Sequence, residues 1–162
     1  MANTRKKALR HEKVYYIKTK ENYVLFGAGI NSLTTDLGAN IEEDHYIIDK
    51  NGSSTRTATA KVQSFSGDMI IGDEAQDYIA SLAYALGTEA ETTWVEVDAY
   101  KEPDESGKYP AREVTVMVNV TNDGSGDAGG ALQIEGEIRW QGDPVEGTFD
   151  IATKTFTPAA AG

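Results

Sequence analysis

The stretch from Ser64 to Gly87, SFSGDMIIGDEAQDYIASLAYALG, is the one place where the hydrophobic spacing changes from a strand period to a helical period. Its apolar residues recur at intervals that place them on one stripe of an α-helix, and they are Ala75, Ile79, Leu82, Ala83 and Leu86. Asp73 is placed to cap the first turn, Gln76 completes a capping-box pattern, and Gly87 can end the helix in the left-handed conformation. The sequence predicts a helix over about residues 73–86, with an outward face of Gln76, Asp77 and Ser81.

Strand patterns lie on both sides of this helix. Short apolar runs at Val14–Ile17 and Tyr23–Phe26 predict a hairpin, and residues 58–65 alternate between two faces. After the helix, residues 93–100 alternate with large side chains on both faces, which predicts a strand that is covered on each side.

The clearest strand pair lies in the last third of the chain. One run has the alternating apolar face Val114, Val116, Val118 and Val120, and after the glycine-rich loop 122–130 a second run has the apolar face Leu132, Ile134, Ile138 and Trp140. Gly142-Asp143-Pro144 predicts a turn, residues 145–151 a returning strand, and residues 154–156 a short final strand.

The segment of residues 36–57 is long and polar. It fits either an extended hairpin that turns at Asn51-Gly52 or a mobile loop, and a loop of this length in a compact domain is often functional. In a third interpretation, Tyr46 to Ile48 pack as an ordinary strand and the rest has no role.

Together these patterns predict a mainly β fold, a two-sheet β-sandwich or barrel of about seven or eight strands with one flanking α-helix. Residues 1–12 are expected to form a basic N-terminal arm, residues 13–157 a single domain, and residues 158–162 a flexible C-terminal tail. The length of 162 residues suits one domain.

The composition excludes several classes of protein. There is no cysteine, so neither disulfides nor thiolate metal sites are available, and no apolar run approaches the roughly 20 residues that a membrane span needs. Residues 1–20 carry seven basic residues against Glu12, a net charge of +6, whereas the remainder has 8 basic and 25 acidic residues, a net charge of −17. A basic arm of this kind can associate with the acidic surface of an identical copy, remain solvated, or bind nucleic acid.

No catalytic, cofactor-binding or metal-binding residue is predicted. His11 and His45 lack a second ligand at metal spacing, and the segment Asp123–Asp127 lacks the glycine and the glutamate of a calcium loop. Glu135 and Glu137 share one strand face and could in principle act as the carboxylate pair of a glycosidase, but the pattern is typical of a solvent-exposed face. Enzymatic activity is therefore not expected. Trp94, Tyr100 and Tyr109 could line a sugar platform, which makes a carbohydrate-binding β-sandwich module the alternative function, although core packing explains such aromatics more simply.

The order of these parts resembles the major tail proteins, or tail tube proteins, of long-tailed bacteriophages. The resemblance runs from about Lys13 to Phe156 and rests on the basic arm, the early hairpin, the long polar loop, the phrase Phe65-Ser-Gly67-Asp68 before the capped helix, and the long strand pair. It rests on layout and short phrases, without a catalytic signature.

This resemblance implies a structural virion protein that forms hexameric rings, which stack into a tube for the passage of genomic DNA without specific binding. The implied partners are further copies of the chain, a tape measure protein and the tail terminator and tip proteins, with no membrane and no cofactor. The protein would be made in the cytoplasm of the host bacterium and would function in the phage tail. The arm, the segment 36–57 and the C-terminal tail become candidates for contacts between rings.

Overall fold

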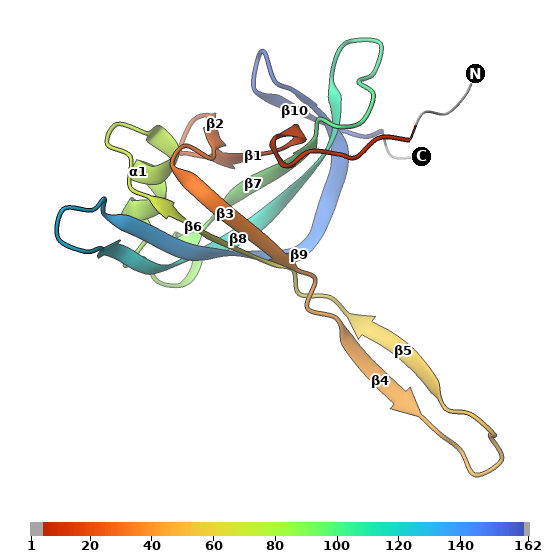
Figure 1. Cartoon of the computed structure of the whole chain (residues 1–162). Coiled ribbons are helices and arrows are strands. Elements are labelled where there is room, and N and C mark those ends of the chain that lie inside the picture. The colour runs from red at the N-terminus through yellow and green to blue at the C-terminus, as the bar shows by residue number, and fades with distance from the viewer. Residues whose placement is uncertain (1–4, 161–162) are drawn as a thin grey trace.

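The computed structural model describes residues 5–160, so those parts of the expected arm and tail that fall at residues 1–4 and 161–162 lie outside the described residues. In chain order the elements are η1 (Arg10–Glu12), β1 (Lys13–Lys18), β2 (Tyr23–Phe26), β3 (Ile30–Asp36), β4 (Asn40–Asp44), β5 (Ser53–Ala58), β6 (Val62–Asp68), α1 (Glu74–Ser81), η2 (Gly87–Ala90), β7 (Glu91–Asp98), β8 (Tyr109–Ser125), β9 (Gln133–Asp150) and β10 (Thr155–Pro158). Strands dominate, and the one α-helix of the described residues flanks the sheet (Figure 1). The predicted mainly β class with one flanking helix is confirmed.

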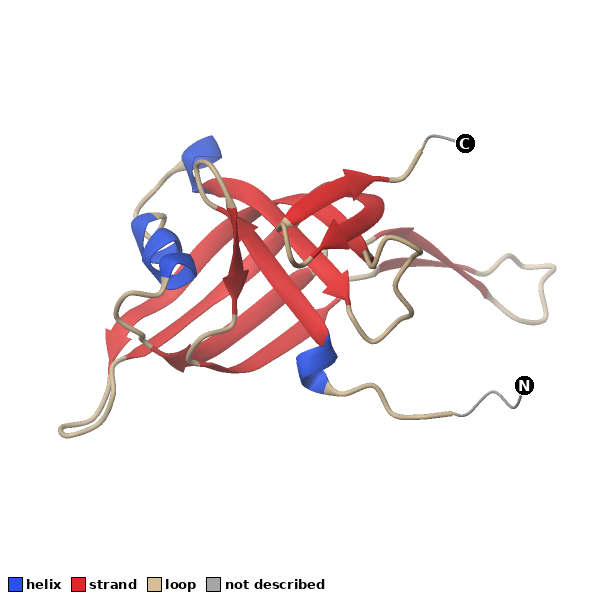
Figure 2. Cartoon of the chain, turned by 90° about the horizontal axis from the view of Figure 1, so that it is seen from above, coloured by secondary structure: helices blue, strands red, loops and turns tan. Residues whose placement is uncertain are grey.

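Eight strands form one antiparallel sheet that curls into an open barrel (Figure 2). Its path is β2-β1-β7-β8-β9-β6-β3, and β10 pairs with β9 beside this path. The curl is visible in the core, because the Phe26 ring of β2 packs 5.2 Å from both Phe65 of β6 and Trp94 of β7. Strands that are distant along the sheet therefore share one core. The predicted hairpin of β1 and β2 is confirmed.

Hydrophobic side chains are buried on both faces of the sheet. The larger cluster fills the inside of the curl and includes Trp94, Ile138 and Ile79 of α1. The smaller cluster lies outside, where Tyr16 of β1 packs 4.4 Å from Phe149 of β9. Because β1 and β9 are not neighbours in the sheet, the far half of β9 must fold back across the outer face. This explains why β7 is covered on each side, as its alternation predicts.

The helix begins where the sequence predicts and ends earlier. The Asp73 side chain accepts a hydrogen bond from the Gln76 backbone N–H at 2.9 Å, as an N-cap should. After Ser81 the backbone changes to bonds between residues three apart, such as Ala83 N–H to Ala80 O, which ends the regular α-helix. Leu86, expected on the buried stripe, is 82% exposed.

Gln76 does not lie on the outward face. It is buried, its Nε2 donates to the carbonyls of Ala28 and Asp68, and its Oε1 accepts from the Ile70 N–H. The amide therefore satisfies three backbone groups of the turns beside the helix instead of completing a capping box. A buried polar side chain is stable only with such partners, which is why this position needs a glutamine-like group.

The predicted turn at Gly142-Asp143-Pro144 is wrong. Strand β9 continues through it and stays paired with β8, since Gln141 lies opposite Thr115 and Val145 lies opposite Glu113. The three residues form a bulge, and Gly142 supplies the left-handed conformation that the extra length requires (φ +73°). The chain instead reverses after Asp150 and returns as β10.

Candidate assembly surfaces

Within the segment predicted as long and polar, residues 40–58 form an extended hairpin, here called the hairpin, which projects from the barrel (Figures 1 and 2). Strands β4 and β5 pair only with each other, and every residue of both strands is exposed. The hairpin interpretation is thus confirmed, but the chain turns at Tyr46–Asp49, where the Asp49 N–H donates to the Tyr46 carbonyl at 2.9 Å. The predicted turn position at Asn51-Gly52 is wrong by a few residues.

The tip of the hairpin, residues 45–52, presents large apolar side chains to solvent. Tyr46, Ile47 and Ile48 are 64%, 105% and 89% exposed, so they do not pack as an ordinary strand. No element of the described chain covers them, although burial of each isoleucine would contribute about 2 kcal/mol. An exposed apolar group at the end of a projecting arm is typical of a contact surface for another molecule.

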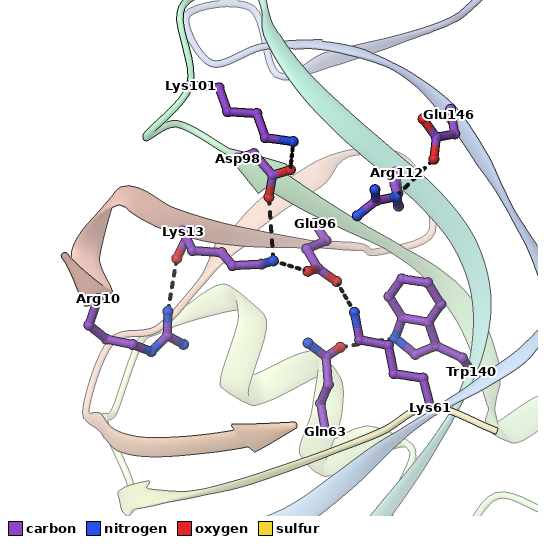
Figure 3. A network of polar contacts seen from close by, with 10 residues as sticks. All are labelled: Arg10, Lys13, Lys61, Gln63, Glu96, Asp98, Lys101, Arg112, Trp140 and Glu146. Atoms are coloured by element: carbon purple, nitrogen blue, oxygen red, sulfur yellow. Dashed lines mark hydrogen bonds and ion pairs between the residues drawn. The ribbon is translucent and has the colours of Figure 1, made fainter. Parts of the chain in front are cut away.

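The root of the hairpin is fixed to the barrel at Lys61 (Figure 3). The Lys61 carbonyl accepts a hydrogen bond of 3.0 Å from the Trp140 backbone N–H, and its ammonium group lies 4.2 Å from the centroid of the Trp140 ring. The same ammonium donates to Glu96 Oε2 at 2.7 Å. Three interactions of different kinds thus hold the point where β5 returns to the sheet.

Glu96 and Asp98, here called the acidic pair, are both buried on β7 and bind lysines from three segments (Figure 3). Lys13, at the end of the arm, forms ion pairs with both carboxylates. Lys61 binds Glu96 at the root of the hairpin, and Lys101 in the loop after β7 binds Asp98 at 3.0 Å. The acidic pair therefore connects the arm, the hairpin and this loop to the centre of the sheet.

The pKa directions agree with this arrangement. Burial alone would raise the pKa of Asp98, but the hydrogen bond from Lys101 and the charges of Lys13 and Lys101 outweigh it and hold the pKa below its ordinary value. Burial likewise acts to lower the pKa of Lys13, and the hydrogen bond to Glu96 and its charge reverse this and raise it. Asp98 and Lys13 are therefore both charged near neutral pH.

The arm leads into the barrel through the short turn η1. The Arg10 guanidinium lies 5.2 Å from the Tyr15 ring centroid and donates to the Lys13 carbonyl at 3.1 Å. Before it, the basic side chains of Arg5, Lys6 and Lys7 are exposed. The positive charge predicted for the arm is thus free to meet an acidic partner.

A second set of exposed apolar residues lies in the segments around α1, and this helix is on the side of the molecule away from the hairpin (Figures 1 and 2). This helix-side patch comprises Ile70, Ile71, Tyr84, Leu86 and Leu132. Tyr84 donates a hydrogen bond to Asp123 at 3.1 Å, which places acidic side chains among the apolar ones.

The residues considered for sugar binding do not form a platform. Trp94 is fully buried and stacks on Tyr15 at 5.4 Å in the inner core. Tyr109 packs against the cluster on the other face of the sheet, so the two rings cannot contact one ligand. Tyr100 lies at the surface beside Lys101.

The polar residues considered for chemistry are likewise separated. His11 lies in η1, and His45 lies in the hairpin tip with Nε2 3.1 Å from the Asp49 carbonyl. Glu135 accepts from Asn122, and Glu137 accepts from Asn119 and Arg139, as on a solvated strand face. Within residues 5–160, no group of three or more potential ligands could hold a metal ion, and no helix has the length and hydrophobicity needed to cross a membrane.

No protein-family model and no curated protein matches this sequence. Among solved structures, the fold is similar to a chain in the tail of an empty GTA particle with C6 symmetry, with a TM-score of 0.63 and 10% identity over 85% of this chain and 97% of that chain. It is also similar to a chain in an extracellular contractile injection system, described as a PVC sheath/tube terminator in the extended state, with a TM-score of 0.56 and 12% identity over 88% and 97% of the two chains. This chain therefore has a tail-tube-like fold.

Proposed function

We propose that this protein is a structural component of a phage tail, in which copies of the chain form hexameric rings that stack into the tail tube. The observation that carries the proposal is the combination of a tail-tube-like fold with a projecting hairpin whose apolar tip has no partner in the described chain. In a lone protomer this apolar surface stays exposed to water and does not stabilise the fold, whereas in an assembly it can be buried against another copy.

Contacts within a ring are proposed at the sheet edges. Strands β2 and β3 end the path of the main sheet, and their outer edges pair with no strand of the described residues. Unpaired edges readily accept strands from another copy, and closure around a ring removes them. The C6 symmetry of the GTA tail supports six copies per ring.

Contacts between rings are proposed for the hairpin, with the arm and the C-terminal segment beside it. The hairpin extends beyond the barrel in both views, as a contact with a neighbouring protomer would require (Figures 1 and 2). Its root is fixed by Lys61, so the tip is held in a defined direction.

The charge of the chain supports a role as a conduit for DNA. Residues 21–162 carry a net charge of −17, and a wall of the same sign as DNA does not retain phosphates, so the genome passes without specific binding. In this role the protein is made in the host cytoplasm and functions in the virion, without enzymatic activity. The tape measure protein would lie inside the tube, and the terminator and tip proteins would bind its ends.

Electron microscopy of the purified full-length chain tests the proposal. The expected result is rings or tubes with six-fold symmetry, formed in a manner that depends on protein concentration. A chain that stays monomeric at every concentration and salt condition, by light scattering as well as by microscopy, would rule out self-assembly.

A further inference from the structure

A groove lies between the two free edges of the main sheet, β2 and β3. It has a volume of about 500 Å³ and opens beside η1. Its apolar lining consists of Val14, Leu25, Phe26, Ile30 and Leu33, and its polar side chains include Arg10, His11 and Lys13, of which Lys13 is already paired with Glu96 and Asp98. Leu25 is half exposed, so the apolar floor is accessible from outside.

The hairpin tip has the complementary composition. Its apolar Tyr46, Ile47 and Ile48 are bracketed by Asp44 and Asp49, and all five side chains are exposed. An apolar centre with a charged rim is the usual layout of a protein interface, in which opposite rim charges set the orientation. The tip would place isoleucines on the apolar floor and carboxylates beside the guanidinium group of Arg10.

The helix-side patch is the rival acceptor for the tip. It is also apolar, but its surroundings carry Asp73 and Glu74 at the start of α1 and Asp123 beside Tyr84, which would face the aspartates of the tip. Like charges brought together in an interface disfavour it. Electrostatics therefore selects the groove over this patch.

The occupant must come from another copy. The hairpin of each protomer points away from its own barrel in both views, so its tip is remote from its own groove (Figures 1 and 2). A tip in a groove joins two different surfaces of one chain, and such contacts close into a ring or repeat along a filament, depending on the rotation between neighbouring copies.

We propose that the hairpin tip of one protomer docks in the groove between β2 and β3 of another protomer, with Ile47 and Ile48 on the apolar floor and Asp44 and Asp49 facing Arg10. This inference rests on the proposed function and names the receiving surface of the contact between rings.

Disulfide cross-linking tests this contact directly, because the chain has no cysteine of its own. Full-length Ile48→Cys is mixed with full-length Leu25→Cys under assembly conditions and oxidised, and cross-linked species are counted on a denaturing gel. The matched control mixes Ile48→Cys with Ile71→Cys, since Ile71 is as exposed as the tip and lies in the rival patch. Each single variant alone reports contacts between identical positions.

The proposal expects a covalent dimer from the Ile48→Cys and Leu25→Cys mixture, and little from the control mixture. Tubes that form without this cross-link, or with a preferred link to Ile71→Cys, would overturn the groove assignment and leave the proposed function intact. The absence of both tubes and cross-links would count against both.

A charge exchange provides a second measurement. Arg10→Glu in the Leu25→Cys chain should lower the yield of the cross-link about threefold, as for an exposed ion pair, and Asp44→Lys in the Ile48→Cys chain should restore it. Lys20→Glu, in the turn at the other end of β1, is the matched control and should leave the yield unchanged. The assigned orientation is contradicted if Arg10→Glu leaves the cross-link yield unchanged, or if Lys20→Glu lowers this yield as much as Arg10→Glu does.

Discussion

Lys61 at the root of the hairpin donates a 2.7 Å hydrogen bond to Glu96, which is buried in the middle of the sheet. Glu96 also pairs with Lys13 of β1, so one carboxylate links two segments that are far apart in sequence. The contact explains how an exposed hairpin can keep a defined direction without a core of its own. It also makes Glu96 the residue whose loss should affect the hairpin and the arm together.

Glu96→Gln should lower the free energy of unfolding by about 2 kcal/mol, since it removes a buried charge, leaves Lys61 without its carboxylate partner and leaves Lys13 with Asp98 alone. The rate of amide hydrogen exchange should rise at Ala60, next to the root of the hairpin, and in β1, which Lys13 connects to Glu96. Glu146→Gln, which breaks the exposed pair with Arg112, is the control and should cost less than about 1 kcal/mol. Equal effects of the two changes, or unaltered exchange at Ala60, would show that the acidic pair does not fix the hairpin.

The lowered pKa of Asp98 gives a pH dependence with a definite sign. A carboxyl whose pKa is lower in the folded than in the unfolded chain contributes stability above its unfolded pKa of about 4, and this is lost as the pH falls through the folded value. Lys13 has a raised pKa, so its contribution is complete below about pH 10 and is lost as the pH rises through the folded value. Urea unfolding between pH 3 and 11 should show a plateau between these limits.

The variant Asp98→Asn distinguishes the contribution of Asp98 to the pH dependence of stability from that of the other acidic groups. It should lower the plateau, and it should flatten the decline of stability on the acid side relative to the unmodified chain. An acid limb of unchanged slope would mean that the ion pairs of Asp98 with Lys13 and Lys101 contribute nothing measurable.

The helix that the sequence predicts over residues 73–86 contains two leucines that the pattern treats alike, whereas in the structure both follow the end of α1 and differ in exposure. Leu82 is buried in the inner cluster, whereas Leu86 is almost fully exposed. Leu82→Asp should unfold the protomer or cost more than about 3 kcal/mol, because it places a charge in the core. Leu86→Asp should change the free energy of unfolding by less than about 0.5 kcal/mol. Thermal unfolding followed by circular dichroism compares them, and a folded Leu82→Asp chain that fails only in assembly would make α1 an interface.

Local signals in the sequence predict the parts of the fold that depend on local chemistry. Asp73 caps the helix because its own side chain reaches the next turn, and the alternation of β7, β8 and β9 follows from burial of one or both faces. The pattern cannot distinguish an apolar residue in a core from one exposed for contact with a partner, which is why it assigns the exposed Leu86 to the buried stripe and does not decide the role of the hairpin tip.

Polar contacts between residues that are far apart in the sequence cannot be predicted from the sequence pattern. Gln76 binds Ala28, 48 residues away, and Lys61 binds Glu96, 35 residues away, so neither partner can be found by spacing. The groove exists only because the sheet curls until β2 and β3 approach one another. Its basic rim is visible in the sequence as the arm, but its apolar floor comes from three separate strands.

Substitutions at the hairpin tip should impair assembly without changing the stability of the protomer. Ile47→Ser together with Ile48→Ser should leave the free energy of unfolding within about 0.5 kcal/mol of the unmodified chain, because both side chains are already in water. The same pair should raise the protein concentration needed for tube formation at least about tenfold, since each isoleucine would otherwise bury its surface in a neighbour. Light scattering and electron microscopy over a concentration series measure this, with Ile71→Ser as the equally exposed control. Tubes that form at the unmodified concentration would remove the tip from the contact, and equal loss with Ile71→Ser would indicate that exposed apolar surface in general, not this tip, drives association.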